Sequence, residues 1–468
     1  MVSIGFDRRT PPKWSGRLCA LVVAAGLVAA CAPPGAVSSP AGSQGAAATP
    51  AGSPSGTATA AGPSCGTDPV ELNAYFETGF DLPFKLSEEF TKQFPNVTWK
   101  ISQDQFTNLM SATPRLLAGD NPPDLIRLPS MVSLVKDNLL KNLDEYVTAF
   151  GWDKFPAAQL AQNRVATDGT RGSGSLYAAG LNYSLTGVFY NKQLAQQIGM
   201  TTPPATVEEF EGLLAKAKTA KLQPIMIWNA TASGGGLAFP LQNLMAAYGP
   251  TQPINDWIFQ KPGATIDTPT NLTAAQHLQQ WIEAGYFPKD VNAIEYTDAQ
   301  SRFGKGEGVF MFNGDWQNAG YDKDMSSNAG FFVFPPGQAG GSLAAMSAPL
   351  TYGIAAKAKN ADCAAFFLNW VATNDKAREI DVAVGGSNPG GPPDLPVPQA
   401  TAPITNETLA AGAEVAKDNG AMDFIANATG SIFAQGWTPE LQKMVGDKQD
   451  AAGLLKAVQA EYEKELAQ

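Results

Sequence analysis

From residue 65 onward, the pattern of hydrophobic and polar positions predicts strands and helices that alternate along the chain. Short runs that are apolar throughout, or that alternate with a period of two, are typical of buried strands. Longer segments with apolar residues three or four positions apart are typical of helices that bury one face. The expected strands are 69–77, 96–101, 124–128, 187–190, 309–312 and 350–356, and the expected helices are 84–94, 206–217, 272–282 and 363–372. This alternation predicts an α/β fold with open sheets flanked by helices.

The first residues carry a basic stretch followed by a short apolar run. Arginine and lysine side chains lie between residues 8 and 17, and residues 18–30 are uncharged and mostly apolar. This order is typical of a secretory signal, and the run is too short to span a bilayer as a stable helix. The small residues 28–30 before Cys31 resemble a bacterial lipobox, in which the cysteine is acylated and becomes the new N-terminus.

We therefore expect residues 1–30 to be a lipoprotein signal peptide and Cys31 to be lipidated. The alternative is a simple secretory signal whose cleavage site happens to include a cysteine. Residues 31–64 consist almost entirely of Ala, Gly, Ser, Pro and Thr, a composition that cannot bury enough apolar surface to fold. As a flexible coil this tether spans roughly 30 Å. The folded part is thus expected outside the cytoplasm, at the outer face of the cytoplasmic membrane, attached to the membrane through the lipid anchor only.

Charge and length limit the possible functions. The whole chain has a net charge of −11, and removal of residues 1–30 leaves −14 because that segment holds more positive than negative side chains. Since lysine and arginine do not cluster in the folded part, a nucleic acid is a poor candidate partner. Residues 65–468 exceed what one core usually supports, so they should split into two lobes. Apart from the signal, no apolar run is long enough to cross a membrane.

Cysteine and histidine usage narrows the chemistry further. Cys65 and Cys363 are the cysteines of the folded region, and the expected compartment permits oxidation. A Cys65–Cys363 disulfide is favoured over the alternative of two unrelated buried thiols. His277 is the only histidine and has no acidic or nucleophilic partner nearby in the sequence, so a solvated surface role is expected. This argues against Ser/His/Asp or Cys/His catalysis and excludes metal sites built from several histidines. Neither a metal nor a cofactor is expected.

Four groups of segments carry a family pattern. They are LAG and PPD at 117–124, VFYNK to TVEEF at 188–210, GKGEGVFMFNGDW at 304–316, and residues 346–353 with 364–374. In this order they resemble the extracellular solute-binding proteins of sugar-type ABC importers, the broad family that includes maltose-binding protein. One departure is Pro114, which lies in a segment that the family builds as a helix, and which should kink or shorten that helix.

The resemblance implies two α/β lobes joined by a multi-stranded hinge, with the ligand in the cleft between them. The N-terminal lobe would comprise residues 65–178 and 345–373, and the C-terminal lobe residues 179–344 and 374–468. It also implies a monomer that is not an enzyme. Such a protein captures a mono- or oligosaccharide and delivers it to the transmembrane subunits of an ABC permease.

The segment from Asn313 to Trp316 is the first candidate for ligand contact. A sugar presents an apolar C–H face and a ring of hydroxyls, so its site needs a flat aromatic group and planar polar groups. Trp316 is expected to stack on the sugar, with Asp315 and Asn313 bonding hydroxyls, at a strand end where α/β sheets place ligands. The alternative is that Trp316 packs a corner between a strand and a helix.

Further candidates lie at strand ends or near turns, and they are Glu77, Phe80, Asp81, Arg127, Tyr183, Trp228 and Phe239. Glu77 could instead cap the next helix, and Arg127 could reach a ligand carboxylate or form an interlobe salt bridge. Tyr183 could line the cleft or pack the hinge. Trp228 and Phe239 could be stacking platforms or core residues.

Two other classes of function remain open. The same fold could bind a non-sugar solute: a polyamine would need several cleft carboxylates, a glycerol phosphate would need a basic or helix-N-terminal pocket, and a peptide is a third such cargo. A secreted carbohydrate hydrolase needs only two carboxylates and no histidine. However, the sequence shows no second carboxylate motif to pair with Asp315.

Overall fold

The computed structural model describes residues 62–231 and 234–467. The expected signal peptide, the lipidation site Cys31 and almost all of the tether lie outside the described residues. Within the described residues, none of the helices is long and apolar enough to cross a membrane.

The strands form an eight-stranded mixed sheet with the order β2-β1-β3-β9-β6-β7, in which β10 also pairs with β9 and β8 with β6. Parallel pairing joins β1 to β2 and β3, whereas β9 and β6 are antiparallel to their neighbours in this order. Each expected strand overlaps a strand of this sheet. The strands are β1 (Val70–Glu77), β2 (Val97–Asp104), β3 (Leu125–Arg127), β6 (Ala178–Asn191), β7 (Phe310–Gly314), β8 (Ala329–Phe332), β9 (Ala345–Gly353) and β10 (Ala421–Met422), with β4 (Arg164–Val165) and β5 (Ser175–Leu176) as a separate pair.

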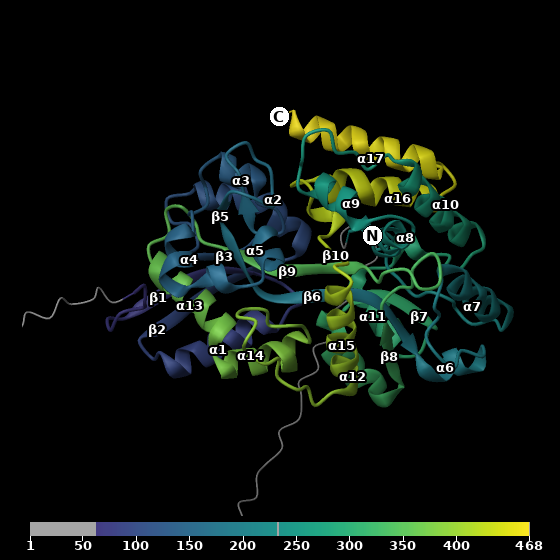
Figure 1. The fold of residues 1–468 in the computed structure, drawn as a ribbon, viewed down its shortest axis with the longest axis horizontal. Helices are drawn as coiled ribbons and strands as arrows, with labels where there is room; N and C mark the ends of the chain where they lie inside the picture. Colours follow the sequence, from purple (N-terminus) through teal and green to yellow (C-terminus); the bar gives the residue numbers. More distant parts are fainter. Residues whose placement is uncertain (1–61, 232–233, 468) are drawn as a thin grey trace, which may run out of the picture. The chain divides into compact units, whose positions relative to one another are not determined.

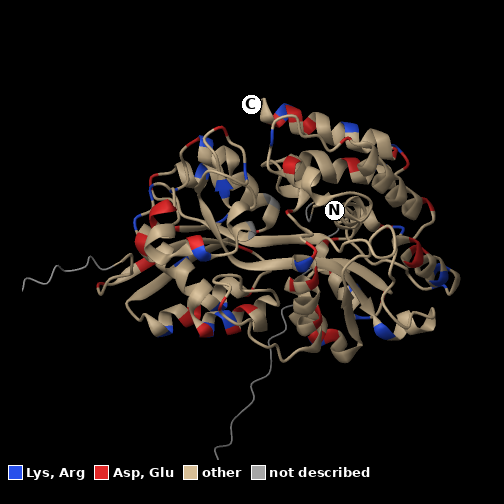
Figure 2. Cartoon of the chain, viewed as in Figure 1, with Lys and Arg blue, Asp and Glu red and all other residues tan. Residues whose placement is uncertain are grey.

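Strands β6 and β9 run through both halves of the structure (Figure 1). They pair with each other from Ala178 and Gly353 to Leu185 and Ser347, with an irregular register between Gly180 and Tyr183. Beyond Leu185, β6 continues and pairs with β7 and β8. Neither strand contains a charged residue, and in Figure 2 the acidic and basic residues lie mainly in the outer helices, where they are interspersed.

Two groups of helices flank the sheet, one around each half (Figure 1). The first group is α1 (Leu82–Gln93), α2 (Phe106–Ala118), α3 (Val132–Lys136), α4 (Asp144–Phe150), α5 (Ala157–Ala161), α13 (Ala361–Thr373) and α14 (Asp375–Ile380). The second group is α6 (Lys192–Gln197), α7 (Val207–Thr219), α8 (Ala238–Tyr248), α9 (Thr251–Ile258), α10 (Pro269–Glu283), α11 (Tyr296–Gly304), α12 (Asn318–Met325), α15 (Pro403–Lys417), α16 (Thr438–Val445) and α17 (Ala451–Leu466). Pro114 does not end its helix, because α2 continues to Ala118.

Separate hydrophobic cores define two lobes. The core of the N-terminal lobe draws on residues 65–181 and 350–377, and the core of the C-terminal lobe on residues 185–348 and 404–462. The chain therefore crosses between lobes within β6 and within β9. The third crossing comes later than expected, because α14 packs on α1 and α13, and Val384 still contacts the N-terminal core. Helix α14, which the sequence assigns to the C-terminal lobe, thus packs on the N-terminal one, whereas residues 381–385 contact elements of both lobes.

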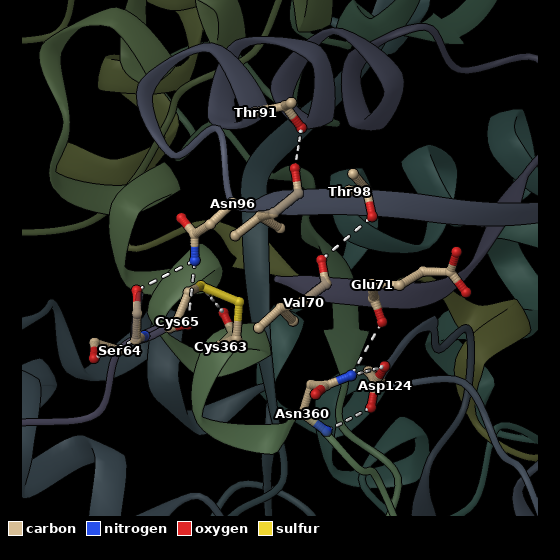
Figure 3. The surroundings of a disulfide bond; sticks show 12 residues. Ser64, Cys65, Val70, Glu71, Thr91, Asn96, Thr98, Asp124, Asn360 and Cys363 are labelled. Carbon is tan, nitrogen blue, oxygen red and sulfur yellow. Dashed lines mark hydrogen bonds between the residues drawn. A yellow bond between two sulfur atoms is a disulfide. The ribbon is translucent and has the colours of Figure 1, made fainter. Parts of the chain in front are cut away.

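A disulfide bond between Cys65 and Cys363 fixes the start of the described chain to helix α13 (Figure 3). The side chain of Asn96 donates hydrogen bonds to the carbonyls of Gly66 and Asp68, at 3.2 and 3.1 Å. The bond thus ties residue 65 to the N-terminal lobe.

Candidate ligand-binding site

A pocket of about 170 Å³ lies between the two lobes and is bordered by both. The N-terminal lobe contributes Glu77 and Arg127, and the hinge strands contribute Ser184, Met346 and residues 348–350. Most of the remaining wall is aromatic and comes from both lobes: Phe80, Phe106, Trp228, Phe239, Tyr296, Trp316, Phe424 and Phe433. Glu77, Phe80, Arg127, Trp228, Phe239 and Trp316, which the sequence proposes separately, are thus brought to one pocket.

A second pocket of about 210 Å³ adjoins the first, because both are lined by Phe80, Ser184, Trp316 and Leu350. Asp81, another sequence candidate, lines this second pocket at the start of helix α1. The rings of Phe80 and Trp316 come from opposite lobes, and their centroids are 6.5 Å apart. This pair separates the two pockets.

The aromatic side chains form a connected network around Trp316. The indole N–H of Trp316 donates a hydrogen bond of 2.6 Å to the hydroxyl of Tyr296. The Tyr296 ring meets the Trp228 ring nearly edge to face, at a centroid distance of 4.6 Å. Phe239 contacts Trp228 and Trp316 at 5.2 and 6.3 Å. Because each ring is held by its neighbours, the pocket wall is a fixed apolar surface.

A second branch of this network extends toward helix α2. Phe239 contacts Phe424 at 4.9 Å, and Phe424 contacts Phe433 of the π-helix η8 (Ile432–Trp437) at 5.5 Å. Phe433 meets Phe106 of the N-terminal lobe edge to face at 6.2 Å. Aromatic contacts therefore bridge the lobes at two places, Phe80–Trp316 and Phe106–Phe433.

Glycines make room for three of these rings. A side chain at Gly314 would collide with the Trp316 ring, one at Gly236 with the Trp228 ring, and one at Gly234 with the Phe433 ring. The ring lies across the glycine backbone in each case, which no other residue permits. The glycine-rich turn before α8 thus positions pocket aromatics.

Glu77 and Arg127 form an ion pair at the ends of β1 and β3. The Glu77 carboxylate accepts a hydrogen bond of 3.1 Å from Arg127 Nε, and Arg127 Nη1 donates to the Thr351 carbonyl at 3.3 Å. Burial raises the pKa of Glu77, and the charge and hydrogen bond of Arg127 oppose that rise. The pair lies within the N-terminal lobe and does not bridge the lobes, since the parallel strands β1 and β3 are neighbours.

Asp315 and Asn313 line neither pocket and instead bond to the protein itself. Asp315 is 2% exposed, and its carboxylate accepts from the Leu185 N–H at 3.0 Å and from the Ser387 hydroxyl at 2.7 Å. Asn313 is fully buried and donates to the Tyr321 hydroxyl at 2.9 Å. Both side chains satisfy buried polar groups where the end of β7 meets other segments.

Tyr183 packs the hinge. Its main-chain N–H donates to the Asn388 carbonyl at 2.8 Å, and its ring lies against Gly390. Burial raises the pKa of its hydroxyl. The ring borders a small cavity of about 20 Å³ beside Trp152 rather than the interlobe pocket.

Sequence reasoning missed four aromatic residues of the wall: Phe106, Tyr296, Phe424 and Phe433. The first two begin helices α2 and α11, and an aromatic residue at a helix start carries no periodic signal. His277 lies outside the pocket, where it bonds to Glu211 at 2.7 Å and stacks on Tyr248. Among the residues that the structure describes, acidic, cysteine and histidine side chains form no group of three that could hold a metal ion.

Comparisons with known proteins agree with this architecture. The family model of bacterial extracellular solute-binding proteins matches residues 71–378. The multiple sugar-binding protein of Streptococcus mutans serotype c (strain ATCC 700610 / UA159) is 23% identical over 297 residues, which are 62% of this chain and 67% of that protein.

Solved structures share the two-lobe fold. A chitin oligosaccharide binding protein has a TM-score of 0.71 and 21% identity, over 86% of this chain and 100% of that chain. Maltose-bound T. maritima MalE3 has a TM-score of 0.66 and 17% identity, over 84% of this chain and 99% of that chain. Since the family model covers more than half of the sequence, this chain belongs to the family of bacterial extracellular solute-binding proteins.

Proposed function

We propose that this protein captures a carbohydrate in the pocket between its lobes and delivers it to an ABC importer without breaking a bond. The observation that carries the proposal is the aromatic wall, to which both lobes contribute. Flat aromatic faces suit the C–H faces of sugar rings, and a ligand that touches both lobes favours the arrangement in which they are close. Relatives named for sugars, such as the multiple sugar-binding protein and the maltose-bound structure, support this choice.

The charge of the pocket favours a neutral ligand. Among the described residues that line the aromatic pocket, Glu77 is the one carboxylate and Arg127 the one guanidinium, and they pair with each other. A polyamine would need several unpaired carboxylates, and a phosphate would need an unpaired cation or an open helix N-terminus. Helix α1 has the acidic Asp81 at its N-cap position, which disfavours an anion there.

The polar groups of the wall suit hydroxyls, which both donate and accept hydrogen bonds. The indole nitrogen of Trp228 is buried and has no hydrogen-bond partner among the described residues. In this arrangement that N–H is out of reach of a ligand, so the polar contacts of a sugar fall to other groups of the wall. Glu77 and Arg127 offer an acceptor and donors at the opposite side of the pocket.

Hydrolysis is the weaker alternative. A glycosidase places two carboxyl groups on either side of the scissile bond. Asp315 is occupied by Leu185 and Ser387, and Glu77 is occupied by Arg127. The pocket wall therefore offers no second carboxylate within the described residues that could act with Glu77.

We further propose that the protein works as a monomer at the outer face of the cytoplasmic membrane, anchored through lipidated Cys31. The lipobox-like residues before Cys31 and the uncharged tether to residue 64 support this placement. The cargo would pass from the closed protein to the transmembrane subunits of the permease when the lobes separate.

Ligand titration of the purified protein tests the proposal. Thermal shift and tryptophan fluorescence are measured with galactose, maltose, raffinose, chitobiose, glycerol 3-phosphate, spermidine and a tripeptide, and products are checked by chromatography after overnight incubation. Saturable stabilisation by a sugar that is recovered intact is expected. A response only to the charged ligands or the peptide would refute the carbohydrate assignment, and sugar turnover would show an enzyme.

A pair of variants locates the site. Trp316→Ala should weaken sugar binding about tenfold or more, because it removes a stacking surface. Trp99→Ala is the matched control. Trp99 is also partly buried and also contacts an aromatic ring, but it lies on β2 and packs against the N-terminal core, away from the pocket. Equal loss of affinity in both variants would mean that the effect comes from stability and not from the pocket.

A further inference from the structure

A buried ion pair joins the two lobes beside the pocket. Arg171 lies in the hairpin between β4 and β5, whose residues Val165 and Leu176 belong to the N-terminal cores. Asp423 follows β10, and its neighbour Phe424 belongs to the C-terminal core. Arg171 Nη2 donates to Asp423 Oδ2 at 2.6 Å, and the two side chains are only 5% and 2% exposed.

Further contacts of Arg171 reach across the same boundary. Its main-chain N–H donates to the Phe259 carbonyl at 2.9 Å, and its guanidinium lies 4.9 Å from the centre of the Phe259 ring. Nη1 donates to the Asn427 carbonyl at 3.4 Å. Within its own lobe, Nη2 also donates to the Gln162 carbonyl at 2.8 Å. Arg171 therefore bonds to the C-terminal lobe more extensively than to its own.

The other oxygen of Asp423 shapes a part of the pocket wall. Oδ1 accepts from the Phe424 N–H at 2.7 Å and from the Asn427 side chain at 2.9 Å. Phe424 and Asn427 both line the aromatic pocket. One carboxylate thus holds a pocket segment of the C-terminal lobe and, at the same time, an arginine of the N-terminal lobe.

We propose that Arg171 is a positioning residue that links closure of the lobes to assembly of the pocket wall. In the closed arrangement Arg171 and Asp423 compensate each other's burial, whereas loss of either partner would leave a buried unpaired charge, so the intact pair supports closure. A ligand that contacts both lobes favours the same arrangement, and the two effects must therefore reinforce each other. This inference rests on the proposed capture of a ligand between the lobes.

The test compares Arg171→Gln, Asp423→Asn, their double variant and the conservative Arg171→Lys with wild type. Arg378→Gln is the matched control, because Arg378 is 2% exposed and donates to the carbonyls of Ala372 and Gly390 without crossing to the C-terminal core. Stopped-flow tryptophan fluorescence gives association and dissociation rates for the sugar of the panel that binds wild type. Small-angle X-ray scattering gives the radius of gyration with and without that sugar.

The expected result is a dissociation rate about 10- to 100-fold higher in Arg171→Gln, within the usual range of coupling between sites, with a much smaller change in association. The double variant should lose no more affinity for the sugar than whichever single variant, Arg171→Gln or Asp423→Asn, binds it less tightly. Arg171→Lys should keep part of the affinity that Arg171→Gln loses. Arg378→Gln should lower only the melting temperature. Arg171→Gln and Asp423→Asn should also scatter as larger particles than wild type at the same sugar concentration.

The outcomes separate this inference from the function. If no panel sugar binds wild type, the proposed function fails, and scattering of the ligand-free variants still tests the ion pair. Unchanged dissociation and unchanged scattering in Arg171→Gln, with a melting temperature lowered as in Arg378→Gln, would overturn the inference. Arg171 would then be a static support of the hinge.

Discussion

Substitution of Asp315 separates two roles that its position beside Trp316 allows. If the carboxylate bonds a ligand hydroxyl, Asp315→Asn should weaken binding and leave stability unchanged. If it supports the protein, as its bonds to Leu185 and Ser387 indicate, Asp315→Asn should be tolerated and Asp315→Ala should destabilise the fold. We expect the second result, because Asp315 is 2% exposed and lines neither pocket.

The bonds give the size of the effect. Alanine leaves the N–H of Leu185, a residue only 3% exposed, without its acceptor, which costs about 1–3 kcal/mol. The Ser387 hydroxyl keeps the Gly385 carbonyl at 3.1 Å as an alternative acceptor, so losing its bond to Asp315 costs little. With the added cavity, Asp315→Ala should lower the free energy of unfolding by about 2–4 kcal/mol. The asparagine oxygen can accept from the Leu185 N–H, and its NH2 group can donate to the Ser387 hydroxyl, which keeps the Gly385 carbonyl as its acceptor. Asp315→Asn should therefore change the free energy of unfolding by about 1 kcal/mol or less.

The pH dependence offers an independent test of the same assignment. Burial raises the pKa of Asp315 well above its usual value, although its bonds to Ser387 and to main-chain N–H groups act in the opposite direction. A carboxyl whose pKa is higher in the folded state stabilises the fold fully below the unfolded pKa of about 4, and loses this contribution as pH rises through the folded pKa. Relative to Asp315→Asn, wild type should therefore gain stability as pH falls from neutral toward 4.

Urea unfolding at several pH values and titration with the panel sugar measure these effects. Asp124→Asn is a suitable control, because Asp124 is 3% exposed and accepts main-chain N–H groups of Asn73 and Asn360 in the N-terminal lobe. Normal unfolding together with lost sugar binding in Asp315→Asn would refute the reasoning and assign the carboxylate to the ligand. A stability difference from Asp315→Asn that does not vary with pH would refute the burial argument.

Two further changes have defined outcomes. Replacing both Cys65 and Cys363 by alanine should lower the free energy of unfolding in urea by up to about 5 kcal/mol. The disulfide closes a loop with a sequence separation of 298, and the loop entropy that it removes from the unfolded chain grows with loop length. An unchanged midpoint of urea unfolding would contradict this. Gly314→Ala should weaken sugar binding about as much as Trp316→Ala in a calorimetric titration, because its side chain would collide with the Trp316 ring; wild-type affinity would show that the ring can move at no cost.

Local signals in the sequence predicted the elements because they depend on neighbours in the chain. The expected helix 206–217 is an example, because Thr206 and Glu209 have the spacing of a capping box. The Thr206 hydroxyl accepts from the Glu209 N–H at 3.2 Å, and α7 begins at the next residue. The strand over 69–77 corresponds to β1, since its apolar pattern matches the buried positions. Pro114 does not stop α2 from reaching Ala118, because a proline removes one helical hydrogen bond and the neighbouring bonds remain.

The site was predicted in part, and the missing part depends on tertiary pairing. Trp316, which lines the pocket, was a candidate because an aromatic residue at a strand end is visible in the sequence. Phe106 and Phe433 meet across the lobe boundary although more than half of the folded chain separates them. Arg171 and Asp423 are 252 positions apart, and nothing local marks either as an interlobe residue.

Two pocket segments of the C-terminal lobe share one arrangement, in which a buried aspartate directly precedes an aromatic residue of the pocket wall. Asp315 and Asp423 are each buried, each accepts main-chain N–H groups, and each directly precedes a ring of the pocket wall, Trp316 or Phe424. A sequence that pairs a carboxylate with an aromatic residue suggests that both touch a sugar. A buried carboxylate is costly unless it is bonded within the protein, so here the acid holds the backbone and the ring lines the pocket. Loss of charge should therefore matter for binding at Asp423, where Arg171 of the other lobe is its partner, and not at Asp315, whose partners are neutral.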